Sequence, residues 1–262
     1  VALSDDLLSL EGEPVLLLKP EGDWETRSGD TRWNEGPFVV RHEGKYYLYY
    51  SVNGYWMKEY SVCAAVADAP LGPYVKCANN PLLQYLEKDG EVLVSGPGHN
   101  SFLTIGEELF TAYHTHTYPL APSGNRQLCL DRAGFHRDGT PYICGPTLAP
   151  QLKPLSELGL VNLMQTAQTA DDEAGFLTDG DICVAETSEP YLWAGNRVTF
   201  TWESPVTADL LLIYGKSGQS LSGKVTINGE LTADLETVVA DAGAAALLAF
   251  LPLQVSSLTF AF

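Results

Sequence analysis

The sequence predicts an all-β protein, with a repeated strand pattern of the β-propeller type in its first part and a β-sandwich after it. The 262-residue chain is rich in glycine (24) and proline (16), which favours many short strands joined by turns over long helices. A strand–turn–strand pattern occurs twice, about sixty residues apart, which is the spacing of propeller blades. A proline-punctuated stretch over residues 146–154 then marks a boundary.

The elements of the first part are predicted in chain order. In both copies of the pattern a strand leaves a Gly-Pro pair, at Gly36 and at Gly96, and runs through a turn into a strand rich in aromatic residues. Apolar and β-branched runs bounded by turn residues predict each strand. The expected strands cover residues 14–18, 38–41, 45–51, 61–67, 100–104 and 108–114.

The boundary stretch divides the chain into residues 1–150 and residues 151–262. After it, further β-type runs predict a β-sandwich of about 100 residues. Only residues 241–247, which are rich in alanine, have the composition of a helix, and Gly243 weakens it. The expected strands of the sandwich cover residues 197–202, 208–214, 223–229 and 257–260.

The composition excludes several kinds of partner. The formal net charge is −18, so phosphate backbones would be repelled and nucleic acid is not expected as a partner, whereas a neutral polysaccharide is unaffected. No apolar run reaches the length of a membrane span, so no membrane partner is expected. The five cysteines form no metal-type cluster, and most are expected to be buried thiols.

Glu35 is the main candidate for catalysis. It lies in the run Trp-Asn-Glu-Gly-Pro-Phe over residues 33–38, between Trp33 and Phe38. Apolar neighbours disfavour the charged form of a carboxyl group, as a proton donor requires. A turn carboxylate that caps backbone amides fits the same residues equally well.

The longer run over residues 33–51 resembles the fourth-blade signature of glycoside hydrolase family 43, in which the glutamate before Gly-Pro is the proton donor. The resemblance implies that Glu35 is the general acid, and that residues 1–150 form the C-terminal part of a five-bladed propeller, about blades 3 to 5. Further matches in the family's order lie at residues 71–74, 80–83, 96–101, 113–116, 126 and 138–141.

Substrate-binding residues are expected around the acid. Trp33 and Phe38 flank it, and Trp56 follows an aromatic strand into a loop, where it would either stack on a sugar ring or pack in the core. Arg126 resembles the arginine that lies near the substrate pocket in the last blade of the family.

Three histidines are candidate metal ligands. His99 alone has the setting of a structural histidine, but the resemblance implies a position on the propeller axis, where it would hold a calcium or sodium ion through waters or support the floor of the active site. His114 and His116 are two residues apart on one strand and face the same side. They have no evident third ligand, so packing is the expected role.

The resemblance leaves part of the mechanism unassigned. An inverting glycosidase needs a second carboxylate about 6.5–9.5 Å from the acid. In family 43 this base is a first-blade aspartate and a third-blade aspartate tunes the acid, but neither motif occurs. Asp6 lies in a segment that resembles the end of the third blade, and Val1 opens the chain without a methionine or a leader-like stretch. A complementary chain, self-association or a truncated N-terminus is therefore expected to account for the missing blades, and the chain alone is expected to be inactive.

The functional prediction is an exo-acting, inverting glycosidase on side chains of plant cell-wall polysaccharides, either an α-L-arabinofuranosidase or a β-xylosidase, in a secreted or periplasmic setting. The alternatives are a non-catalytic carbohydrate-binding protein and one subunit of a split enzyme. Residues 162–163 and 177–180, with Ala167, loosely resemble the opening of a galactose-binding jelly roll, which predicts an accessory domain that is either structural or glycan-binding.

Overall fold

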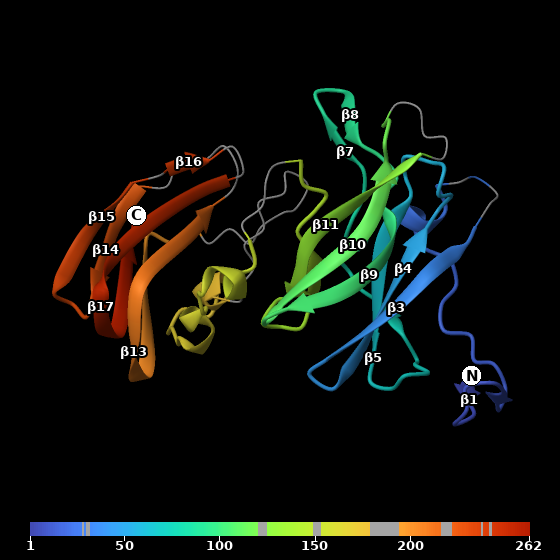
Figure 1. The fold of residues 1–262 in the computed structure, drawn as a ribbon, viewed down its shortest axis with the longest axis horizontal. Coiled ribbons are helices and arrows are strands. Elements are labelled where there is room, and N and C mark those ends of the chain that lie inside the picture. Colours follow the sequence, from blue (N-terminus) through green and yellow to red (C-terminus); the bar gives the residue numbers. More distant parts are fainter. Residues whose placement is uncertain are drawn as a thin grey trace. The chain divides into compact units, whose positions relative to one another are not determined.

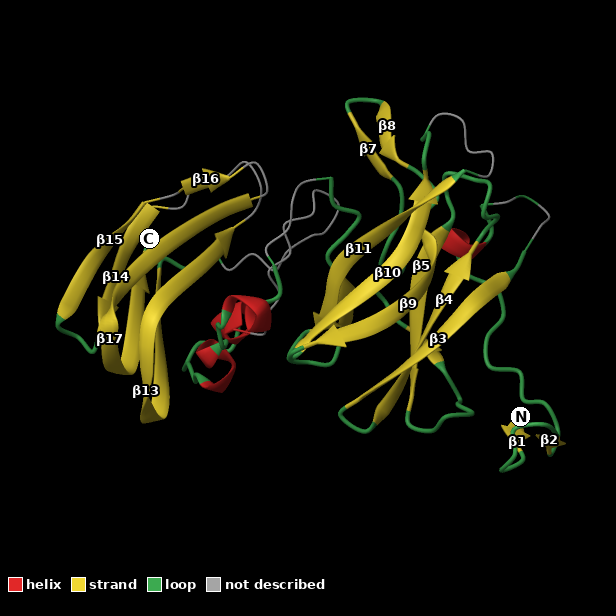
Figure 2. Ribbon diagram, in the orientation of Figure 1, coloured by secondary structure: helices red, strands yellow, loops and turns green. Residues whose placement is uncertain are grey.

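The computed structural model describes residues 1–27, 29, 32–119, 125–148, 153–178, 194–215, 222–236, 238–240 and 243–262. The chain divides into two compact units, residues 1–103 with 111–130, and residues 104–110 with 131–262. Strands dominate both units, as Figures 1 and 2 show, which confirms the all-β prediction. The helices of the described residues are all short, and none of them is long and apolar enough to cross a membrane.

The first sheet has four antiparallel strands in the order β3-β4-β5-β6. Its central strands are almost entirely buried, which explains their apolar and small residues. The predicted strands over residues 38–41, 45–51 and 61–67 are therefore confirmed. The strands are β3 (Asn34–His42), β4 (Lys45–Val52), β5 (Ser61–Ala67) and β6 (Val75–Lys76).

A bulge interrupts the pairing of β3 with β4. Glu35 pairs with Ser51 and Phe38 pairs with Tyr49, so β3 carries an extra residue between the two pairs. Gly36 lies in this bulge with a φ of 58°, a left-handed conformation that glycine adopts without strain. The bulge therefore changes the course of β3 directly after Glu35.

A hairpin and a second four-stranded sheet follow. This sheet has the order β12-β11-β10-β9, and its first two strands along the chain confirm the predicted strands over residues 100–104 and 108–114. Four consecutive antiparallel strands are the size of one propeller blade, but the arrangement of blades in a propeller stays a prediction. The strands are β7 (Leu86–Lys88), β8 (Glu91–Val94), β9 (Gly98–Ile105), β10 (Glu108–His116), β11 (Arg126–Phe135) and β12 (Pro141–Ile143).

The predicted strand over residues 14–18 is wrong. The N-terminal region has only a small pair of strands, β1 (Ala2–Leu3) and β2 (Leu10–Glu11), and residues 14–18 join no ladder. Pro14 and Pro20 lack the backbone N–H that a ladder needs. Leu18 instead packs against the core cluster that contains Tyr50 and Cys63.

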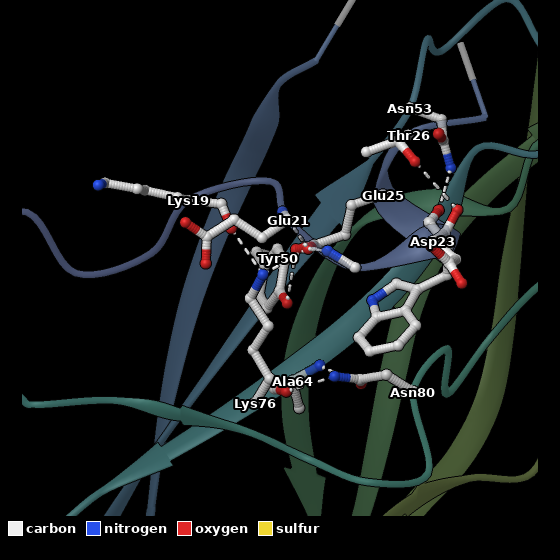
Figure 3. A network of polar contacts seen from close by, with 12 residues as sticks. Lys19, Glu21, Asp23, Glu25, Thr26, Tyr50, Asn53, Ala64, Lys76 and Asn80 are labelled. Carbon is white, nitrogen blue, oxygen red and sulfur yellow. Dashed lines mark hydrogen bonds and ion pairs between the residues drawn. The ribbon is translucent and has the colours of Figure 1, made fainter. Parts of the chain in front are cut away.

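Buried Glu25 anchors the segment before β3 to the first sheet (Figure 3). It lies in the short helix η1 (Asp23–Glu25), and its carboxylate accepts hydrogen bonds from the backbone of Gly22 (2.7 Å) and from the Tyr50 hydroxyl (3.0 Å). Lys76 of β6 pairs with the same carboxylate and also donates to the carbonyl oxygen of Lys19 (2.6 Å). Burial raises the pKa of Glu25, but the Lys76 ammonium and the backbone donors outweigh it and hold this pKa below its ordinary value.

The second unit contains a five-stranded antiparallel sheet. Its strands follow the order β13-β17-β14-β15, and β16 pairs with β17. Side chains at alternating positions, such as Val198, Phe200 and Trp202, fill a core to which Ala167 and Ala174 also contribute. The strands are β13 (Arg197–Gly215), β14 (Ser222–Ile227), β15 (Leu231–Glu236), β16 (Val238–Ala240) and β17 (Gly243–Ala261), and the other short helices are η2 (Leu155–Leu158), η3 (Leu163–Thr166) and η4 (Ala174–Thr178).

Several predictions for this region change. The two strands expected over residues 197–202 and 208–214 are one irregular strand, β13. The helical tendency expected for residues 241–247 is overruled over residues 243–247, which belong to β17. Ala244 and Ala245 pair with both β13 and β16, and ladder partners on two sides outweigh local propensity. Residues 241–242 lie outside the described residues. The described residues form one sheet here, so the sandwich stays a prediction. Residues 149–152 of the expected linker, residues 179–180 and Cys183 lie outside the described residues.

Candidate active site

Glu35 lies near the start of β3, directly before the bulge. Its side chain is half-buried, and its Oε1 accepts a hydrogen bond of 2.6 Å from the hydroxyl of Tyr60. A hydrogen bond between a phenol and a carboxylate at this distance is short and strong. Oε1 is therefore occupied, and Oε2 has no hydrogen-bond partner among the described residues.

Tyr60, which the sequence did not single out, is held in place from two sides. It directly precedes β5 and is fully buried, and its ring stacks on His114 with centroids 5.6 Å apart and an interplanar angle of 21°. On the other side the backbone of Gly98 lies so close that a Cβ atom there would come within 2.1 Å of the Tyr60 ring. Burial and the hydrogen bond to Glu35 raise the pKa of Tyr60, so its hydroxyl remains a donor.

Ser51 connects this pair to His99. The Ser51 hydroxyl accepts a hydrogen bond of 2.7 Å from the backbone N–H of His99, and it also hydrogen-bonds to Tyr60. Ser51 lies opposite Glu35 in the β3–β4 ladder and is fully buried. The strand register therefore brings Glu35, Ser51, Tyr60 and the start of β9 together.

The two histidines of β10 have structural roles. Burial, and then the positive charges of Arg126, His99 and His116, lower the pKa of His114 to about 4, so its ring is neutral near pH 7. His116 is buried and hydrogen-bonds through Nδ1 to Ser95 Oγ (2.8 Å) and through Nε2 to the carbonyl oxygen of Tyr55 (2.8 Å). His116 thus fixes the backbone of the loop that carries Tyr55.

The donor set around His99 does not form a metal site by itself. The His99 side chain is exposed, and among the described residues no three His, Cys, Asp or Glu side chains lie close enough to hold an ion. Calcium prefers oxygen ligands, and a single imidazole is a poor match for it. The calcium near His99 stays a prediction, and no step of the mechanism uses it.

Three aromatic side chains form an exposed group, here called the aromatic platform: Trp33, Tyr55 and Trp56. Trp33 and Trp56 meet edge-to-face with centroids 5.4 Å apart, and Trp56 meets Tyr55 in the same way at 5.1 Å. The three are 40%, 43% and 41% exposed, far more than packing requires. Arg126 lies over the Tyr55 ring at 5.2 Å, and its charge also acts on Tyr60, which contacts Glu35.

Asn53 supports the platform through its backbone and its side chain, a role that was not predicted from the sequence. It is fully buried with a φ of 69°, and its carbonyl oxygen accepts a hydrogen bond of 2.7 Å from Trp33 Nε1. Its side chain bonds to the backbone of Trp24 (2.8 Å), Arg27 (2.9 Å) and Glu59 (2.9 Å). An asparagine directly before a glycine is the available signal, because asparagine tolerates this conformation.

The structure brings most of the predicted site residues together. Glu35 and His99 share the Ser51–Tyr60 chain, and Trp33, Trp56 and Arg126 share the platform region. Phe38 differs, because it lies beyond the bulge and packs against Phe102, with ring centroids 5.6 Å apart. Its ring therefore contributes to packing in the first unit.

The model of the glycosyl hydrolases family 43 matches residues 1–141, which is more than half of the chain. The chain belongs to glycosyl hydrolases family 43. The match includes the whole of β3 and β4, the three residues of the platform and Arg126. Family membership confirms the resemblance on which the assignment of Glu35 was based.

Curated relatives of this family-43 chain are glycosidases by name. A β-D-galactofuranosidase from Aspergillus niger is 29% identical over 140 residues, which cover 53% of this chain and 36% of that protein. An extracellular exo-α-(1→5)-L-arabinofuranosidase from Streptomyces avermitilis is 30% identical over 145 residues, which cover 51% and 29%. The chain therefore matches only about a third of the length of these relatives.

Solved structures agree with the family. A thermostable family-43 glycoside hydrolase is 49% identical, with a TM-score of 0.55, over 58% of this chain and 48% of that chain. An endo-1,4-β-xylanase from Bacteroides thetaiotaomicron is 32% identical, with a TM-score of 0.50, over 58% and 51%.

Proposed function

We propose that the protein is a glycoside hydrolase that acts on side chains of plant cell-wall polysaccharides, with Glu35 as the general acid. The observation that carries the proposal is the half-buried Glu35 carboxyl group, in which Oε1 accepts a hydrogen bond from buried Tyr60 and Oε2 has no partner among the described residues. The family and the glycosidases among its relatives support the same assignment.

The proposed step is proton donation with inversion. Glu35 gives its proton to the glycosidic oxygen as the bond from that oxygen to the anomeric carbon breaks, and water attacks the anomeric carbon from the opposite face. The attacking water gives its proton to a second carboxylate, about 6.5–9.5 Å from the acid. The sugar is released with inverted configuration, and the two carboxyl groups have exchanged protonation states.

We propose that the second carboxylate is supplied by a further segment or by another chain. The motif of the first-blade aspartate that serves as the base in family 43 does not occur in this sequence. Glu25, the buried carboxylate of the same unit, is already occupied by Lys76 and Tyr50. A carboxylate held in this way cannot take up the proton of an attacking water.

The aromatic platform is proposed to bind the sugar rings. Exposed indole and phenol faces pack against the C–H faces of sugars, and Arg126 supplies donors for hydroxyl groups. The curated relatives are named for galactofuranose and arabinofuranose, which are both five-membered ring sugars. An α-L-arabinofuranosyl or related furanosyl side chain is therefore the favoured substrate, and a β-xylosyl group is the alternative.

Turnover of aryl glycosides tests the proposal. The purified chain would be incubated with 4-nitrophenyl α-L-arabinofuranoside, β-D-galactofuranoside and β-D-xyloside, with and without a candidate complementary chain. We expect the wild-type protein to hydrolyse these glycosides. Glu35→Gln should abolish hydrolysis of substrates with poor leaving groups and reduce it less for substrates with activated leaving groups. Equal losses for both leaving groups would show that Glu35 is not the acid.

A carbohydrate-binding protein without catalysis is the second candidate. The exposed platform favours it, and so does the absence of the first-blade aspartate motif from the sequence. If the protein bound oligosaccharides but did not hydrolyse them, even in the presence of the complementary chain, this result would support the non-catalytic candidate. Native mass spectrometry of the purified protein would show whether such a chain is bound.

The location and the C-terminal region are also part of the proposal. One relative is named as extracellular, which supports a site of action outside the cytoplasm, where cell-wall polysaccharides occur. For residues 151–262 we propose an accessory domain that binds glycan or stabilises the first unit. Binding of oligosaccharides to residues 151–262 expressed separately would distinguish the two roles.

A further inference from the structure

A directed chain of hydrogen bonds ends on one oxygen of Glu35. It runs from the His99 backbone N–H to Ser51 Oγ (2.7 Å), from the Ser51 hydroxyl to Tyr60, and from the Tyr60 hydroxyl to Glu35 Oε1 (2.6 Å). Ser51 and Tyr60 are both fully buried, so no water competes for these groups.

Counting hydrogens fixes the direction of this chain. A backbone N–H can only donate, so Ser51 accepts from His99 and has its single hydrogen available for Tyr60. Tyr60 accepts that hydrogen and has its own single hydrogen available for Glu35. Reversing any link would leave a buried donor without an acceptor, which is costly.

The Tyr60 ring also cannot turn its hydroxyl elsewhere. One face stacks on His114, and the backbone of Gly98 closes the space on the other side. Burial raises the pKa of Tyr60, which keeps the phenol protonated over the whole range in which a glycosidase works.

We propose that Tyr60, supported by Ser51, is a positioning residue that keeps Oε1 of Glu35 as an acceptor and so places the transferable proton on Oε2. The inference rests on the proposed function, because this proton has a use only if Glu35 is the acid. In the reaction the bond from Oε2 to hydrogen breaks as the hydrogen bonds to the glycosidic oxygen. The carboxylate that results keeps its hydrogen bond from Tyr60, which stabilises the negative charge as it forms.

Tyr60→Phe is the first test, because it removes only the hydroxyl. For an oligosaccharide, whose leaving group needs the proton, kcat should fall on the order of tenfold or more, with little change in KM. For a 4-nitrophenyl glycoside the loss should be smaller, because this leaving group needs little protonation. Ser51→Ala should act in the same direction with a smaller effect.

Tyr49→Phe is the matched control. Tyr49 lies on β4, and its buried hydroxyl has no hydrogen-bond partner among the described residues, so its removal should leave both rates unchanged. Equal losses of Tyr60→Phe on the two substrates, or equal effects of Tyr60→Phe and Tyr49→Phe, would overturn the positioning role.

A double-mutant cycle of Tyr60→Phe and Glu35→Ala in thermal unfolding tests the pairing without catalysis. Tyr60→Phe should lower Tm by about 2–4 °C when Glu35 is present and by clearly less in the Glu35→Ala background. Additive effects would overturn the proposal even in an active enzyme. Complete lack of turnover in the wild-type protein, with coupling retained, would instead contradict the proposed function.

Discussion

At the scale of single residues, the proposed roles in substrate binding and in proton transfer fall on different side chains. Trp56 is 41% exposed and its ring meets those of Trp33 and Tyr55, whereas Glu35 is held by Tyr60. Trp56→Ala should therefore raise KM for oligosaccharides, or Kd in the absence of turnover, by about five- to thirtyfold, because it removes a stacking surface worth about 1–2 kcal/mol. The measurements are steady-state kinetics and calorimetric titration.

Tyr46→Ala is the control for this prediction. Arg41 lies over the Tyr46 ring at 5.7 Å, much as Arg126 lies over the Tyr55 ring. Arg41 and Tyr46 pair in the β3–β4 ladder, at the end opposite to Glu35. Loss of the Tyr46 ring should not alter the binding of oligosaccharides. If Trp56→Ala left binding unchanged as well, the platform would not be the sugar site.

Asn53 is the residue on which the platform loop depends. Its buried side chain satisfies backbone groups of three segments, so Asn53→Ala should lower the free energy of unfolding by about 2–4 kcal/mol and weaken oligosaccharide binding. Urea unfolding measures the first effect. Asn228→Ala is the comparison, since Asn228 has the same left-handed conformation (φ 53°) but is exposed, and it should cost less and leave binding intact.

At the scale of elements, the ion pair of Glu25 and Lys76 joins η1 to β6. The folded pKa of Glu25 is lowered, so its contribution to stability is fully present above the ordinary pKa of about 4.5 and is lost as the pH falls through the folded value. Glu25→Gln should lower stability by about 2–4 kcal/mol at pH 7, and the difference from the wild type should shrink below about pH 4.5. Urea unfolding at several pH values measures it.

The exposed pair of Lys58 and Glu87 is the matched control for this element. These side chains are 37% and 40% exposed and lie 3.3 Å apart, so Glu87→Gln should cost less than about 1 kcal/mol at any pH. A pH-independent effect of Glu25→Gln would mean that the buried pair does not link η1 to the sheet by its charge.

At the scale of the whole molecule, the net charge of −18 selects against anionic ligands. Binding of a neutral arabino-oligosaccharide should change by less than about twofold between low and high salt, because no phosphate-like counterions are released. Titrations at several NaCl concentrations check this. A steep loss of affinity with salt would indicate that Arg126 binds a charged group on the ligand.

The sequence by itself determined the all-β class, most strands of residues 34–116, and the family to which residues 1–141 belong. Local patterns are enough to predict these strands, because the burial pattern of a strand and the turn residues that bound it involve only a few neighbouring positions. Glu35 was singled out as a candidate from residues 33–38, and the resemblance over residues 33–51 gave it the predicted role of general acid.

Only the tertiary structure decided what surrounds Glu35. Tyr60, Ser51 and the backbone of His99 are 25, 16 and 64 positions away in the chain, and strand register and the close approach of Gly98 bring them together. The packing of Phe38 against Phe102 and the strand at residues 243–247 were decided in the same way. Contacts between distant segments depend on the free energy of the whole fold, which no local pattern contains.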